Sequence, residues 1–413
     1  MNTKELPAHP SLEQYKKQAK DLLKSVKSGN PQPLQSILQR LKQDHPRPGR
    51  LAELETKGTE LRLADTQFVI ARDYGFESWP KFAKHIESLI GKSTAASVFE
   101  GAVDAVVAGD LPILERLLRE VPGLVQERSA RLHHATLLHY VGANGVENYR
   151  QKTPKNAVEV AEVLLKAGAG IDAVADIYGG SDTLGLAATS VYPELAGVQE
   201  ALIDVLLEYG AKLSEQLVNA CLANGRGQAA EHLAKRGAPL DLEGSAGVGR
   251  LEQVKTFFNS HGRLKENATQ KQIEYGFRWA CEYGRTDVVD FLLQNGLKVD
   301  AMPRGETGLH WAAFTARVDI VKRLLAKKAP LELRDKRHRA TPLEWALHGW
   351  NNPPLEIERH HYYEVVALLV AAGAAIPPAW FDAQNQSTLA QKIGADARMV
   401  SALRTKSGGG GGS

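Results

Sequence analysis

Cysteine is almost absent from this chain of 413 residues, which contains only Cys221 and Cys281. The two lie 60 positions apart (281 − 221), each within an apolar pattern of helical spacing. This arrangement excludes a disulfide framework and argues against a zinc site built from paired thiols. Both side chains are expected to be small, buried parts of a helical core.

Long hydrophobic runs are missing as well. The longest uncharged apolar-rich stretch, residues 365–376, is too short to cross a bilayer. The N-terminus lacks the apolar segment of a secretory signal peptide. We therefore expect a cytoplasmic protein with no membrane association.

Common catalytic motifs are lacking too, since the sequence contains neither G-x-S-x-G nor H-E-x-x-H. Residues 244–251 carry two glycines at the spacing of a phosphate-binding loop, but Arg250 and Leu251 replace the Lys-Ser/Thr pair of that motif. We interpret this segment as a short helix and a turn. The sequence predicts no catalytic residue, no metal and no cofactor.

The charge of the chain is nearly balanced, with a formal net charge of +3. Residues 1–92 hold 16 Lys and Arg against 11 Asp and Glu, so the basic excess lies in this segment. Five of its lysines fall on one predicted helix, where Glu13 and Asp21 interrupt them. This pattern is typical of a solvated helix face, and nucleic acid is not an expected partner.

A pattern of about 33 residues recurs along the chain. Each clear copy has a Thr-x-Leu-like start, a short apolar helix, and a second amphipathic helix with a Leu pair near its end. In three of the four copies a Gly follows this pair. These copies begin at residues 136, 183, 305 and 340. Weaker copies span residues 102–121, 217–238, 242–262 and 275–296, which gives about eight units.

This pattern resembles the ankyrin repeat, whose signature is T-P-L-H-x-A followed by a second helix. The resemblance covers residues 97–376 and implies an all-α fold, an ankyrin-repeat solenoid of about eight helix pairs. Each pair is too small to bury its own apolar face, so neighbouring pairs must share a core. The resemblance also implies that His139 and His310, the histidines of the signature, bind the backbone of a nearby hairpin.

The two ends of the chain read differently from the repeats. Residues 1–92 are predicted to form a helical cap, with helices at 11–28, 31–44, 62–74 and 79–90, and Ser11 as an N-cap. This segment resembles the helical leader found before ankyrin arrays in a family of bacterial proteins. Residues 377–405 are expected to cap the other end. Residues 406–413 have the composition of an engineered Gly-Ser linker.

The repeat register places tryptophan at one position of three consecutive first helices, at Trp279, Trp311 and Trp345. Indoles at one repeat position are expected to form a row, which offers large apolar area for recognition. The alternative is that they pack between helices. Neighbouring candidate binding residues are Glu282, Tyr283, Thr315 and His348.

A second candidate region lies near insertions at residues 144–156 and 191–198. Its candidate binding residues are Tyr140, Asn144, Glu147 and Tyr178. Polar and aromatic side chains in long loops are typical of a binding site, although solvated loops give the same pattern. A third insertion spans residues 350–361.

Two functions follow from these candidates. The first is a monomeric scaffold that binds a protein or peptide on the concave face of the C-terminal repeats and on the rim loops. The second is a small-molecule-binding protein, or an enzyme, with a pocket between the insertions of units two and three and the concave helices. The sequence favours the first function, by analogy of fold alone.

Overall fold

The computed structural model describes residues 3–7, 10–28, 37, 61–89, 95–354, 357–381 and 388–405. These residues form α-helices and short 3-10 helices but no β-strand, and their only β-type pairings are two isolated bridges. Within the same residues, no helix combines the length and apolar character needed to span a membrane. The predicted all-α fold is confirmed. The predicted helix at 31–44, apart from residue 37, and the tail at 406–413 lie outside the described residues.

The chain divides into two compact parts, Met1–Lys212 and Leu213–Ser413. Among the described residues, the first part opens with α1 (Leu12–Lys27), α4 (Leu63–Asp73) and α5 (Trp79–Leu89). Their core is aromatic, because the rings of Tyr15, Tyr74 and Phe82 lie 5.0–5.3 Å apart. The prediction that Ser11 caps α1 is wrong, since its side chain accepts no hydrogen bond from the helix.

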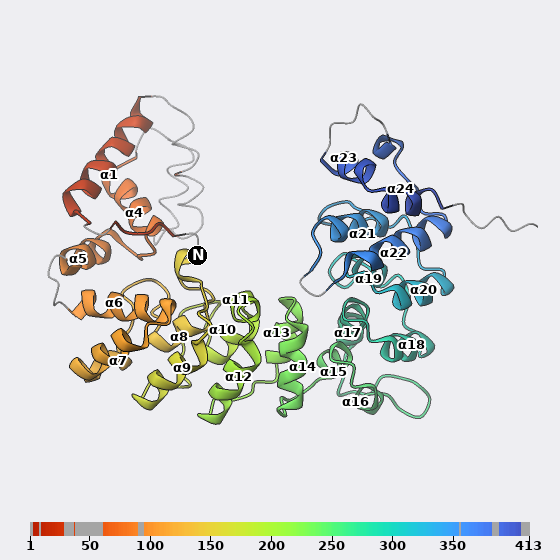
Figure 1. Cartoon of the computed structure of the whole chain (residues 1–413), viewed down its shortest axis with the longest axis horizontal. Helices are drawn as coiled ribbons and strands as arrows, with labels where there is room; N and C mark the ends of the chain where they lie inside the picture. The colour runs from red at the N-terminus through yellow and green to blue at the C-terminus, as the bar shows by residue number, and fades with distance from the viewer. Residues whose placement is uncertain are drawn as a thin grey trace, which may run out of the picture. The chain divides into compact units, whose positions relative to one another are not determined.

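Three helix pairs complete the first part (Figure 1). They are α6 (Ala95–Ala108) with α7 (Leu111–Glu120), α8 (Leu137–Val141) with α9 (Ala157–Lys166), and α10 (Thr183–Thr189) with α12 (Gln199–Glu208). The predicted insertions contain short helices, namely η2 (Asn148–Arg150) and α11 (Val191–Leu195). Both insertions are therefore ordered extensions of a helix pair.

Five further pairs form the second part (Figure 1). They are α13 (Leu217–Ala223) with α14 (Gly227–Lys235), α15 (Leu242–Gly247) with α16 (Leu251–Thr256), α17 (Gln270–Glu282) with α18 (Thr286–Gln294), α19 (Gly308–Phe314) with α20 (Val318–Ala326), and α21 (Pro342–Asn351) with α22 (Arg359–Ala371). After them come η3 (Pro378–Phe381), α23 (Thr388–Ala395) and α24 (Ala397–Leu403). One apolar core runs from Leu242 to Leu403, so successive pairs share their buried faces.

The signature histidines connect each first helix to the hairpin of the next pair. The backbone N–H of Thr307 donates to Nδ1 of His310 at 3.1 Å, and Nε2 of His310 donates to the carbonyl oxygen of Ala340 at 3.1 Å. His139 makes the same bond to Ala173 at 2.9 Å. Burial lowers the pKa of His139 to about 4 and also lowers that of His310, which keeps both rings neutral at pH 7. The structural role predicted for these histidines is confirmed.

Candidate interaction surface

The three repeat-position indoles form a row on the first helices α17, α19 and α21. The centroids of Trp311 and Trp345 lie 5.0 Å apart, with the rings edge to face. Between Trp279 and Trp311 lies the guanidinium of Arg278, whose Cζ atom is 3.7 Å from one ring centroid and 3.9 Å from the other. The row is thus continuous from α17 to α21, but an arginine forms one of its links.

Arg278 occupies the position that His139 and His310 hold in their own units. It does not reproduce the histidine bond to the next hairpin, because its longer side chain turns between the indoles, where it is 4% exposed. Its Nη2 atom lies 3.5 Å from Oε2 of Glu282. Among the described residues, Nε and Nη1 of Arg278 have no hydrogen-bond partner. The stacking energy of two indole faces therefore offsets part of the cost of burying this charge.

The row is anchored by carboxylates. Nε1 of Trp279 donates to Glu243 at 2.8 Å, and Nε1 of Trp345 donates to Asp335 at 3.1 Å. Nε1 of Trp311 is buried and lacks a hydrogen-bond partner within the described residues. The two outer indoles are consequently fixed in orientation by charge-assisted hydrogen bonds.

Several sequence-predicted site residues belong to the interior. Trp279 is 1% exposed and Thr315 is 7% exposed. The Thr315 hydroxyl donates to the carbonyl oxygen of Glu282 at 2.9 Å. The Tyr283 hydroxyl donates to the carbonyl oxygen of Leu222 at 2.8 Å, which ties α17 to α13. Their polar groups are engaged by the protein itself.

The accessible part of the row consists of four side chains, which we call the aromatic face. Trp311, Phe314 and Trp345 are half-buried, and His348 is exposed. Phe314 stacks on His348 with centroids 5.9 Å apart and lies the same distance from Trp345. Phe314 follows Trp311 by one turn, which places it on the same side of α19.

Glu282 lies beneath the row with 8% of its surface exposed. Burial raises the pKa of its carboxyl group to about 7, even though Arg278 and Arg317 oppose the shift. The Glu282 carboxyl group therefore titrates near neutral pH. Its charge state depends on pH in the range where most proteins work.

We predict that Glu282 makes the stability of the folded chain fall as pH rises through neutrality. The folded-state pKa of about 7 lies above the ordinary glutamate pKa of 4.5, so between these pH values the folded state holds a proton that the unfolded state releases. The favourable contribution is complete below the unfolded-state pKa and is lost as pH rises through the folded-state pKa. Urea unfolding at about pH 5 and about pH 8 measures this loss, which Glu282→Gln should abolish.

The control for this experiment is Glu252→Gln, because the Glu252 side chain is 85% exposed. It should leave the difference between the two pH values as it is in the wild type. A Glu282→Gln variant that keeps the wild-type pH dependence would show that Glu282 ionises normally in the folded chain.

The second candidate region is occupied by a buried ion network. Glu147 is 1% exposed and contacts the guanidinium of Arg131, Nη1 of Arg150 at 3.4 Å and Nε2 of His133 at 3.4 Å. Burial opposes ionisation of Glu147, but the hydrogen bond from His133 and the charge of Arg131 hold its pKa well below the usual range. Glu147 is thus a buried anion whose charge is compensated by Arg131 and Arg150.

The network extends into the N-terminal helices. Glu100, on α6, lies 3.0 Å from Arg131 and 2.6 Å from Arg150, and its Oε1 atom lies 3.8 Å from Nε2 of His85 on α5. Tyr140 is 1% exposed, and its hydroxyl donates to Glu147 at 3.4 Å. The polar groups of Tyr140 and Glu147 therefore face protein atoms.

The remaining pair of this region joins two loops. The Tyr178 hydroxyl donates to Oδ1 of Asn144 at 2.9 Å, and Nδ2 of Asn144 donates to Thr189 at 3.1 Å. Tyr178 is 75% exposed and has a φ of +52°. Of the four residues predicted here, Tyr178 offers the most surface to solvent.

We predict that Glu147→Gln destabilises the first part of the chain by about 3 to 5 kcal/mol, because it leaves Arg131 buried beside a neutral amide. The control is Asp104→Asn, since Asp104 pairs with Arg150 at 2.7 Å but its side chain is 67% exposed. This change should cost about 1 kcal/mol or less. Urea unfolding measures both, and equal effects would contradict the importance assigned to the network.

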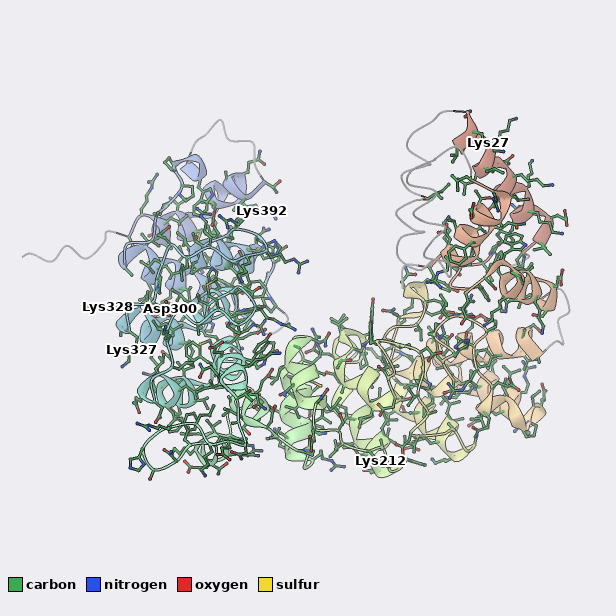
Figure 2. The ribbon with its side chains drawn as sticks, turned by 180° about the vertical axis from the view of Figure 1, so that it is seen from behind. Lys27, Lys212, Asp300, Lys327, Lys328 and Lys392 are labelled. Carbon is green, nitrogen blue, oxygen red and sulfur yellow. The ribbon has the colours of Figure 1, made fainter. Side chains whose placement is uncertain are left out.

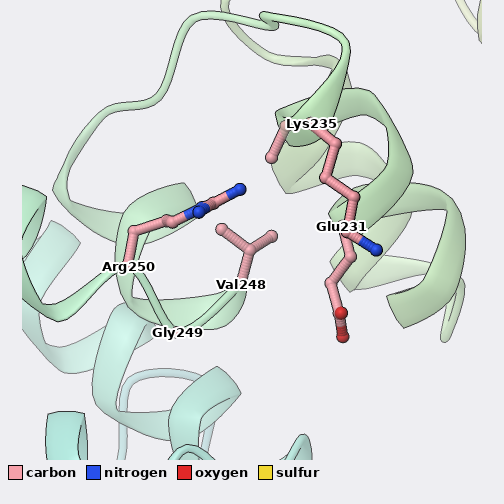
Figure 3. A pocket seen from close by; sticks show the side chains of 6 residues that line it. Glu231, Lys235, Val248, Gly249 and Arg250 are labelled. Carbon is pink, nitrogen blue, oxygen red and sulfur yellow. The ribbon is translucent and has the colours of Figure 1, made fainter.

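A small cavity of about 200 Å³ lies between α14 and the turn before α16. Glu231 and Lys235 project from one side and Arg250 from the other (Figure 3). The glycine-containing segment 244–251 forms part of its wall, as the end of α15 and the following turn. The interpretation of this segment as a short helix and turn is confirmed.

Comparison with known proteins identifies the repeats. Residues 277–349 match the family model for ankyrin repeats (many copies). A stretch of 118 residues is 29% identical to palmitoyltransferase AKR1 of Lachancea kluyveri, which is 27% of this chain and 14% of that protein. The chain therefore spans about one seventh of the length of this relative.

Two solved ankyrin repeat domains resemble part of this chain. The human ASB11 ankyrin repeat domain is 20% identical, with 67% of this chain and 98% of that chain covered and a TM-score of 0.33. The Bcl-3 ankyrin repeat domain is 19% identical, with 64% and 97% covered and a TM-score of 0.29. The family match identifies ankyrin repeats within residues 277–349, a range that contains all three tryptophans of the indole row. Ankyrin repeats generally mediate protein–protein interaction.

Proposed function

We propose that the chain is a binding scaffold whose aromatic face receives a peptide segment of a partner protein. The observation that carries this proposal is the contiguous set of four rings on α19 and α21, half-buried or exposed and in contact with one another. Aromatic side chains held by neighbours supply large contact area at little entropic cost. Such rings act as anchors for a partner.

The supports of the face favour a preformed site. Trp345 is fixed by Asp335, and Trp311 is packed against the Arg278 guanidinium. A peptide would therefore meet rings that need little reordering, which favours affinity. We assign part of the rim of this site to residues 350–354, which follow His348 at the end of α21.

The test uses a random 12-residue peptide library displayed on phage and selected on the immobilised full chain. The peptides recovered are measured by fluorescence polarisation against wild type and the double variant Phe314→Ala, His348→Ala. We expect affinity to fall at least about tenfold in the variant, because two contact rings are lost. Melting temperatures of both proteins separate loss of binding from loss of folding.

The matched control is Tyr178→Ala, which removes an exposed aromatic side chain from the other candidate region. It should bind the selected peptides as wild type does. Peptides that bind the double variant as tightly as wild type would overturn the proposal. Loss of binding in Tyr178→Ala alone would move the site to the loops that contain Asn144 and Tyr178.

A further inference from the structure

The hairpin before α21 is strongly basic. Of its six residues 334–339, five are cationic or titratable bases and one is Asp335. The five basic side chains are all exposed, and they are Arg334, Lys336, Arg337, His338 and Arg339. Asp335 is fully buried. We call residues 334–339 the basic hairpin.

Asp335 organises this hairpin and does not neutralise it. Its carboxylate accepts hydrogen bonds from the backbone N–H groups of Arg337 at 2.8 Å, His338 at 2.6 Å and Ala340 at 2.9 Å, and from the Trp345 indole. Burial opposes its ionisation, but these donors lower the pKa of Asp335 to about 2. The one acidic group of the hairpin is therefore turned inward and committed to the turn.

Most of the cationic side chains of the basic hairpin lack a carboxylate partner. Arg334 lies 3.4 Å from Glu344, but in the described part of the chain Lys336, Arg337 and Arg339 form no ion pair. The preceding hairpin adds the exposed Arg304, next to Gly305, whose carbonyl oxygen accepts the backbone N–H of Lys336 at 3.1 Å. Two adjacent hairpins thus present a cluster of positive charge on a fixed backbone.

We propose that the basic hairpin binds an acidic segment of the same protein partner that occupies the aromatic face. This inference rests on the proposed function, because it names the chemical class of peptide that the surface accepts. The Trp345 indole belongs to the face and bonds to Asp335 of the hairpin, so the two surfaces are adjacent. A carboxylate-rich stretch next to apolar residues would satisfy both.

The geometry favours an acidic peptide over a nucleic acid. Single-stranded nucleic acid requires flat aromatic faces on which bases stack. Arg278 covers faces of Trp279 and Trp311, while Trp345 is in edge-to-face contact with His310, Trp311 and Phe314. One face each of Trp279 and Trp311 is therefore unavailable for base stacking.

The first probe is a fluorescein-labelled peptide of six Glu-Ser repeats, measured by fluorescence polarisation on the full chain. The test variant is Lys336→Glu, Arg337→Glu. The control is Lys327→Glu, Lys328→Glu, which makes the same charge change at two exposed lysines at the end of α20 (Figure 2). We expect the test variant to weaken binding at least about tenfold and the control less than about twofold, with wild-type affinity falling as salt rises.

Three results would overturn the inference: no binding of the Glu-Ser peptide to wild type, an equal loss in the test and control variants, or tighter hairpin-dependent binding of a twelve-residue oligo-dT. If the charge-reversed hairpin fails to fold, Lys336→Gln, Arg337→Gln replaces it. The proposed function is tested separately: it fails if library peptides bind the double variant Phe314→Ala, His348→Ala as tightly as wild type. Library peptides that need the aromatic face but not the hairpin would refute this inference alone.

Discussion

The stacking of Arg278 between two indoles is the contact on which the C-terminal repeats most depend. It joins α17 to α19 at the place where other units use a histidine bond. A buried guanidinium is costly unless its charge is compensated, and here Glu282 and the two ring faces share that task. The indole faces that contact Arg278 are used inside the protein and are unavailable to a partner.

Repeat spacing predicted much of this arrangement. A 33-residue period fixes which positions share a face, so the indole row, the signature histidines and the helix–turn at residues 244–251 followed from the sequence. Spacing does not fix which neighbour a long side chain reaches. The insertion of Arg278 between the two indole rings was therefore not predicted. The sequence signal for this insertion was that Arg278 lies next to Trp279 and 33 residues before Trp311.

Other misses share one cause, which is that burial depends on partners distant in sequence. Glu147 and Tyr140 read as loop-proximal polar residues, but Arg131, Glu100 and Arg150 enclose them in an ion network. Tyr283 and Thr315 lie at helix ends, where a side chain could face a partner. Instead, their hydroxyl groups donate hydrogen bonds to backbone carbonyl oxygens of the chain itself. Ser11 had the sequence of a cap, but no helical N–H group bonds to its side chain.

The bond between Trp345 and Asp335 has a mechanical consequence. The Trp345 indole is part of the aromatic face, and it also donates a hydrogen bond to the carboxylate that holds the basic hairpin in its conformation. Any tilt of this ring must be transmitted to the backbone N–H groups that share the same carboxylate. A substitution of Trp345 would therefore alter the aromatic face and the basic hairpin at the same time.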